Sequence, residues 1–179
     1  MKALYYIVLF TVLTSCVSCE KMNTCKDKEL TIKRAEYSGQ ELRMDGFYFG
    51  NPNVDSQGRN LYELFVFYKN GIVMLPGTVE LNKMEEYIIT ITNSNQQNTK
   101  FVWGLFVINN KEISLEHWVA AQCGYPAVLR SGEILNDTTF VLRKMVRNGS
   151  QGTEETVINE EFNFRQFSPK PDSTNNFIK

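Results

Sequence analysis

Short turn signals separate the apolar runs of this chain. Asn70-Gly71 lies between runs at 60–69 and 72–75, and Asn109-Asn110 and Asn136-Asp137 separate later runs. Asn-Gly is the dipeptide most typical of a two-residue hairpin turn. Connections this short join antiparallel neighbours, because parallel strands need a long crossover. The turns therefore constrain the chain to an antiparallel arrangement of strands.

The strand-like runs recur about every 10 to 15 residues, a spacing typical of a sandwich or a barrel. They cover 40–50, 60–69, 72–75, 100–108, 111–120, 126–135, 138–147 and 155–167. We expect a mainly β fold, an antiparallel barrel of about eight strands. The prolines at 169 and 171 end the last strand, because proline cannot donate to a strand ladder.

One stretch, 81–92, breaks the rhythm of the strands. Its apolar residues fall at helical spacing, and Asn82 is a suitable N-cap with Glu85 three residues later. The β-branched residues of 87–92 leave a strand as the alternative there. We expect one amphipathic helix that covers an open end or a flank of the sheet.

The start of the chain has the pattern of an export signal. Lys2 precedes the uncharged block Leu4–Leu13, which is too short to span a bilayer core of about 30 Å. The following Leu13-Thr14-Ser15-Cys16 resembles the lipobox of bacterial lipoproteins. We expect a signal peptide at 1–15 and lipidation of Cys16, with Cys19 as the alternative.

The remainder divides into a polar tether at 16–30 and a barrel domain at 31–179. Of the other cysteines, Cys25 can pair with Cys123 or with Cys19, and the sequence leaves the choice open. We expect a membrane contact through the N-terminal lipid.

Composition argues against several functions. The 19 basic and 20 acidic residues give a net charge of -1, which argues against a nucleic-acid-binding protein. His117 is the only histidine, so a metal centre built from several histidines is excluded. The chain contains no phosphate-binding loop, nucleophile elbow or paired-carboxylate motif. We therefore expect no enzyme activity, no metal and no cofactor.

Three segments carry a resemblance to a known family. These are Trp103-Gly104 within a strand, 131–140 (SGEILNDTTF) and the tail 164–175 (FRQFSPKPDSTN). Together they are similar to small lipocalin-like lipoproteins of the Bacteroidetes type, over about residues 40–179. The resemblance implies a lipocalin-like (calycin-type) barrel, a lipid anchor in the cell envelope at the outer membrane, and no catalytic residues.

The barrel interior is the candidate binding site. The strands at 60–69 and 100–108 are apolar on both faces, so large rings crowd the lumen. We expect an apolar cavity that binds a small apolar ligand and is lined in part by Phe65, Phe67, Trp103 and Phe164. The alternative is a filled barrel, a scaffold whose loops at 51–59 and 122–125 contact a macromolecule.

Other candidate residues have simpler structural interpretations. Gly104 leaves a gap for a ligand or, more commonly, for a neighbouring ring. We expect the indole of Trp118 at the rim of the barrel with His117 as a polar neighbour. The basic residues of the later strands either point inward toward an acidic head group or lie on a solvated outer face, which we favour; they are Arg130, Arg143, Lys144 and Arg147.

Overall fold

The computed structural model describes residues 26–94, 98–122, 124–149 and 152–179. The predicted lipidation site Cys16, its alternative Cys19, and the candidate disulfide partners Cys25 and Cys123 lie outside these residues, as does the expected signal peptide.

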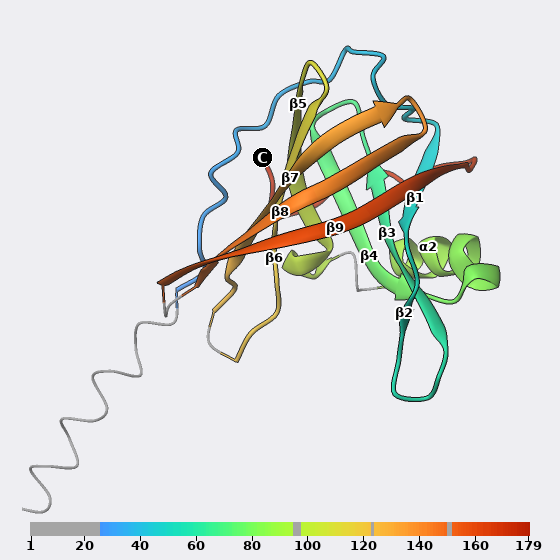
Figure 1. The fold of residues 1–179 in the computed structure, drawn as a ribbon, viewed down its shortest axis with the longest axis horizontal. Helices are drawn as coiled ribbons and strands as arrows, with labels where there is room; N and C mark the ends of the chain where they lie inside the picture. The colour runs from blue at the N-terminus through green and yellow to red at the C-terminus, as the bar shows by residue number, and fades with distance from the viewer. Residues whose placement is uncertain (1–25, 95–97, 123, 150–151) are drawn as a thin grey trace, which may run out of the picture.

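The described strands form a closed antiparallel barrel (Figure 1). Each strand pairs with the next along the sheet, in the order β1-β9-β8-β7-β6-β5-β4-β3-β2, and a further β1–β3 pairing closes eight of them into a ring. The short β2 pairs only with β3. The strands are β1 (Gly46–Gly50), β2 (Asn53–Val54), β3 (Asn60–Phe67), β4 (Ile72–Val79), β5 (Trp103–Asn109), β6 (Glu112–Trp118), β7 (Ala127–Asn136), β8 (Thr139–Gly149) and β9 (Gly152–Gln166). The expected antiparallel barrel of about eight strands is confirmed.

The predicted turns join neighbouring strands. Gly71 has a φ of 81°, and a Cβ there would lie 2.2 Å from the carbonyl oxygen of Ala35. Only glycine fits this turn, because it combines a positive φ with a close backbone approach. Asn110 also has a positive φ, of 56°. We call the end of the barrel with the β3–β4, β5–β6 and β7–β8 turns the hairpin end, and the opposite one the long-loop end.

Buried apolar residues form two separate clusters, one on each side of the sheet. The lumen cluster takes residues from every barrel strand: Tyr48, Phe65, Phe67, Val73, Leu75, Phe106, Ile113, Leu115, Ile134, Phe140, Leu142 and Phe162, together with Leu42. The outer cluster lies on the outside of β1, β3, β4 and β5 and includes Phe47, Leu64, Val66, Met74, Trp103 and Leu105. The double apolar pattern of β3 and β5 therefore reflects two cores.

The helix covers a flank of the barrel and not an end. A short 3-10 turn, η2 (Leu81–Lys83), leads into α2 (Met84–Asn93), which matches the predicted helix at 81–92. Its buried residues, Met84, Ile88 and Ile91, belong to the outer cluster. Tertiary burial thus outweighs the β-branched preference for a strand at 87–92. The cap differs from the prediction, since Asn82 lies within the 3-10 turn and makes no cap bond.

The N-terminal segment runs along the outside of the barrel (Figure 1). The fully buried carboxylate of Glu116 accepts bonds from the amides of Thr31 (2.5 Å) and Ile32 (2.8 Å). The indole of Trp118 donates to the carbonyl of Lys28 at 2.6 Å. Residues 28–30, the last of the expected tether, are therefore held against the barrel.

The same segment then crosses the hairpin end. Leu42 is buried in the lumen cluster, and Tyr37 packs against that cluster. The Tyr48 hydroxyl donates to the carbonyls of Arg43 (3.1 Å) and Asp137 (2.9 Å). The ammonium of Lys170, in the C-terminal tail, donates to the carbonyl of Phe67 at 2.6 Å. These contacts cover the hairpin end, so the long-loop end is the remaining route by which a molecule could enter the lumen.

Candidate ligand-binding site in the barrel lumen

Aromatic rings fill the middle of the lumen. The Phe65 and Phe162 ring centroids lie 4.7 Å apart, and Phe140 stacks on Phe162 at 5.0 Å. Phe67 meets Phe106 edge-on at 4.9 Å. All five rings are at most 1% exposed. This aromatic layer is a packed core of the kind that contributes stability through area and ring geometry.

Three of the four predicted cavity residues face the lumen. Phe65 and Phe67 are part of the aromatic layer, and the half-buried Phe164 packs against it, with its ring 5.3 Å from that of Tyr48. Trp103 does not join them, because it is fully buried in the outer cluster. Since successive side chains alternate, the lumen face of β5 is the one that carries Gly104. The sequence could not show this, because both faces of β5 are apolar.

Four charged or polar side chains form a second group inside the barrel. The Arg130 guanidinium on β7 pairs with both carboxylate oxygens of Glu63 on β3, at 2.7 and 2.9 Å. Glu160 on β9 lies 3.4 Å from the same guanidinium. His117 on β6 lies diagonally across from Arg130, because it pairs with Val128. We call Glu63, His117, Arg130 and Glu160 the lumen charge cluster.

The Arg130–Glu63 ion pair crosses the lumen from wall to wall. β7 and β3 are four strands apart in a closed ring of eight, so they stand on opposite sides of the barrel. The guanidinium carbon lies 5.7 Å from the centre of the Phe65 ring. The charge cluster therefore borders the aromatic layer. His117 lies next to the long-loop end of β6, Glu63 and Arg130 lie near the middle of β3 and β7, and Glu160 lies past the middle of β9.

The hydrogen bond of the His117 ring determines which of its nitrogens carries the proton. The Nδ1 atom lies 3.0 Å from the carbonyl oxygen of Trp118. Since a carbonyl only accepts, Nδ1 carries the proton and Nε2 keeps a free lone pair. Burial, with a smaller effect of the Arg130 charge, lowers the pKa of His117 to about 4. The ring is therefore neutral at physiological pH.

The strand next to β5 explains why residue 104 is a glycine. Gly104 and His117 are paired across β5 and β6. A Cβ at position 104 would lie 2.8 Å from the Cβ of His117 and 2.6 Å from the carbonyl oxygen of Glu116. The missing side chain thus accommodates the close approach of β6, and the nearest atoms belong neither to a ligand nor to a neighbouring ring.

Two atoms of the charge cluster have no hydrogen-bond partner among the described residues. They are His117 Nε2 and Arg130 Nε, both buried. Buried polar groups in native proteins are nearly always paired, so two orphans in one small region require an explanation. One is an acceptor and the other a donor. The two atoms together could hydrogen-bond a group that supplies one donor and one acceptor.

The two carboxylates of the cluster differ in environment. Burial raises the pKa of Glu160, and the nearby Arg130 only partly opposes this. Glu63 instead has the bidentate contact, the stronger geometry for an Arg–carboxylate pair. Counted at formal charges, with His117 neutral, the cluster has one positive and two negative groups.

The basic residues of the later strands lie on two different faces of the barrel, which only the strand register reveals. Arg143, Lys144 and Arg147 are exposed, and the first two pair with Glu133 and Glu155 on the outer face. Arg130 instead points into the lumen, which corrects the favoured expectation of a solvated position. Successive side chains of a strand point to opposite faces, so only one of the adjacent Glu160 and Glu161 can face the lumen. The contact with Arg130 shows that this is Glu160.

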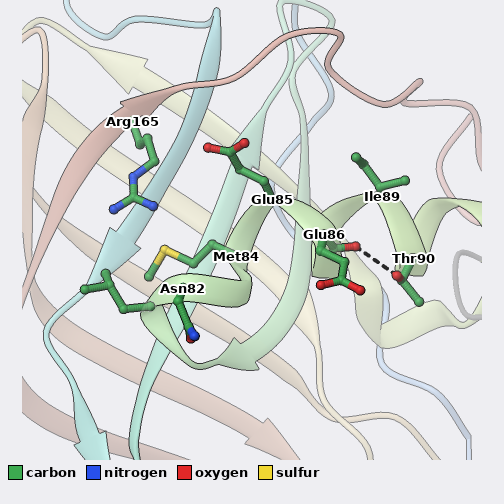
Figure 2. Close-up of a pocket in the computed structure, with 8 residues that line it drawn as sticks. Asn82, Met84, Glu85, Glu86, Ile89, Thr90 and Arg165 are labelled. Atoms are coloured by element: carbon green, nitrogen blue, oxygen red, sulfur yellow. Dashed lines mark hydrogen bonds between the residues drawn. The ribbon is translucent and has the colours of Figure 1, made fainter.

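A groove lies on the outside of the barrel, between α2 and β9 (Figure 2). It has a volume of about 570 Å³ and is lined by Leu81, Asn82, Met84, Glu85, Glu86, Ile89, Thr90 and Arg165. Arg165 lies over the ring of Phe49, at 5.2 Å. Within the described chain no buried orphan atom points into this groove. The lumen is therefore the stronger candidate site.

Comparisons give no further identification. No family model, no curated protein and no solved structure matches this chain. Across the residues with described coordinates, no helix is long and apolar enough to cross a membrane, and no group of three or more metal-ligating side chains occurs. The barrel and its lumen thus define the class of protein by geometry alone, as a closed antiparallel β-barrel.

Proposed function

We propose that this protein is a lipoprotein of the bacterial cell envelope whose barrel binds one small, largely apolar ligand through its long-loop end. The observation that carries the proposal is the lumen charge cluster with its two orphan atoms, His117 Nε2 and Arg130 Nε. The Tyr68 hydroxyl in the outer cluster is a third such atom, but among the residues that the structure describes, only in the lumen do an unpaired donor and an unpaired acceptor lie on neighbouring strands.

The aromatic layer limits where the ligand lies. Phe67, Phe106 and Phe140 occupy the lumen nearer the hairpin end, and Phe67 contacts both of the others. The ligand therefore lies between the charge cluster and the long-loop end, and Phe65 is the predicted cavity residue nearest to the cluster. Thr78, opposite Glu63 in the register, is exposed at this level.

The proposed anchor rests on the sequence of residues 1–16. The uncharged block before Cys16 fits a lipoprotein signal, and residues 28–32 bind the side of the barrel. The barrel would then sit close to the outer membrane. Metabolic labelling with a fatty acid tests this: wild type incorporates label and Cys16→Ala does not. Equal labelling of the variant would make Cys19 the candidate.

A second function remains supported by the aromatic layer itself. Rings that are at most 1% exposed resemble an ordinary core. In this alternative the protein is a scaffold that contacts a macromolecular partner through its loops.

Native mass spectrometry of the lipoprotein purified from its own host distinguishes the two functions. We expect a co-purifying small molecule. Thr78→Trp should release it, because the larger side chain enters the long-loop end of the lumen. Val157→Trp is the matched control, since Val157 is 87% exposed and pairs with the outward-facing Lys144. Absence of any bound molecule, or equal release by both variants, would favour the scaffold.

A further inference from the structure

The orphan atoms of the charge cluster have opposite hydrogen-bonding roles. His117 Nδ1 is committed to the Trp118 carbonyl, so Nε2 is an acceptor. The terminal nitrogens of Arg130 are committed to Glu63 and Glu160, and its Nε–H is a donor without a partner among the described residues. A ligand that satisfies both atoms must donate to one and accept from the other.

The two side chains are diagonal neighbours on the lumen face of β6 and β7. His117 pairs with Val128, and Arg130 lies two residues further along β7 on the same face. Residues in this diagonal relation lie about 7–8 Å apart, within reach of long side chains. Both side chains point into the lumen, and the guanidinium contributes to lowering the pKa of His117.

Neither of the two common ionic head groups can satisfy both atoms. A carboxylate accepts from the Arg130 Nε–H but meets Glu63 and Glu160 and has no proton for Nε2 of His117. An ammonium can donate to Nε2 and is attracted by the two carboxylates, but it has no lone pair for the Arg130 Nε–H. A plain hydrocarbon leaves both atoms unpaired, at a cost of roughly 1–3 kcal/mol for each.

We propose that the ligand is a neutral amphipathic molecule with a hydroxyl group, which donates to His117 Nε2 and accepts from Arg130 Nε. This rests on the proposed function and names the chemical class of its ligand. The apolar part of the molecule would extend from the cluster toward the long-loop end, while Phe65 borders the cluster on the opposite side.

A single histidine makes the test direct. Because His117 is the only histidine, labelling with [15N]histidine gives one imidazole spin system in the full lipoprotein. Four ten-carbon probes are added in turn: decanol, decanoate, decylammonium and decane. We expect decanol to move the Nε2 resonance. Decanol should bind about tenfold more tightly than decanoate or decylammonium, which can each satisfy one of the two atoms, and about a hundredfold more tightly than decane, which satisfies neither.

Substitutions separate the two proposed contacts. Arg130→Lys keeps a positive charge beside Glu63 but removes the Nε–H, so the preference for decanol over decane should fall about tenfold. His117→Phe should lower the same preference by a similar factor, because the Arg130 contact remains, as measured by saturation-transfer spectroscopy of the probes. Arg143→Lys is the matched control, because Arg143 makes similar contacts on the exposed outer face, and it should leave the preference unchanged.

The outcomes distinguish this inference from the proposed function. Equal or tighter binding of decanoate or decylammonium would overturn the hydroxyl assignment and leave a ligand-binding barrel. Binding of decanol without movement of the His117 resonance would do the same, and would leave water as the partner of both atoms. If none of the four probes binds and no molecule co-purifies, both proposals fail and the scaffold function is supported.

Discussion

The two levels of the lumen are built by opposite rules. In the aromatic layer, Phe65, Phe140 and Phe162 satisfy one another by contact and have no polar requirement. In the charge cluster, Arg130 spans the barrel to Glu63, and two polar atoms remain unpaired. A core that only stabilises has the first character. The contrast separates a layer that contributes packing from a group of polar side chains that leaves two hydrogen-bonding atoms unpaired, and the second is the group that we propose for binding.

The strongest way to test this contrast is to remove a ring from the aromatic layer. Phe65→Ala should lower the free energy of unfolding by about 4 kcal/mol, because Phe65 is fully buried and contacts the rings of Phe67, Phe140 and Phe162. Chemical denaturation measures the change. Phe101→Ala is the control, since Phe101 is 40% exposed and should lose much less. Similar losses at both positions would show that the layer is not a tight core.

The charge cluster should give the protein a pH dependence that the aromatic layer cannot. The folded pKa of His117 is about 4, below its unfolded value of 6.5. The unfolded chain therefore binds a proton first as the pH falls, and stability declines from about pH 6.5 toward pH 4. This single group contributes up to about 3 kcal/mol over that range.

Comparison with His117→Phe isolates this effect. The raised pKa of Glu160 acts in the opposite direction near its own titration, but it is common to both proteins. Thermal unfolding followed across pH 4–7 should show a smaller slope in the variant. Parallel curves would contradict the buried, neutral state of His117.

The sequence predicted the barrel well because hairpin turns and strand spacing are local properties. Asn70-Gly71 and the helix at 81–92 were visible in short windows. The charge cluster was not, because Glu63 and Arg130 are 67 residues apart and meet only when the ring closes. The position of Trp103 could not be predicted either, because both faces of its strand are apolar and the sequence does not show which face lines the lumen.

Part of the site could have been predicted by deriving the strand register from the turn positions. Gly104, His117 and Arg130 lie on neighbouring strands, and the turn at Asn109-Asn110 fixes the pairing of the first two. A register drawn from that turn places His117 opposite Gly104 and on the same side as Phe106. The direction of the Arg130 side chain then follows from the next pairing, but the partner Glu63 requires closure of the whole barrel.

The cross-lumen ion pair is the next point to test. Glu63→Gln leaves Arg130 charged with only the more distant Glu160, so unfolding should become easier by about 2 kcal/mol, less than for a fully buried pair. Glu133→Gln removes the partner of Arg143 on the exposed face and should cost at most about 0.5 kcal/mol. Denaturation of the two variants side by side measures the difference. Equal effects would show that the lumen pair is solvated like a surface pair.

The smallest expected effect distinguishes the roles of the two lumen carboxylates. Glu160 is 41% exposed in its side chain, lies 3.4 Å from Arg130, and has a pKa raised by burial. Its charge therefore receives little net support from the pair, and Glu160→Gln should change stability at pH 7 by no more than about 0.5 kcal/mol. The same variant makes the cluster neutral, because one guanidinium then faces one carboxylate. Decanoate should accordingly bind more tightly to Glu160→Gln than to wild type, while stability stays the same. A large loss of stability instead would mean that Glu160, like Glu63, is a structural partner of Arg130 and not a determinant of ligand charge.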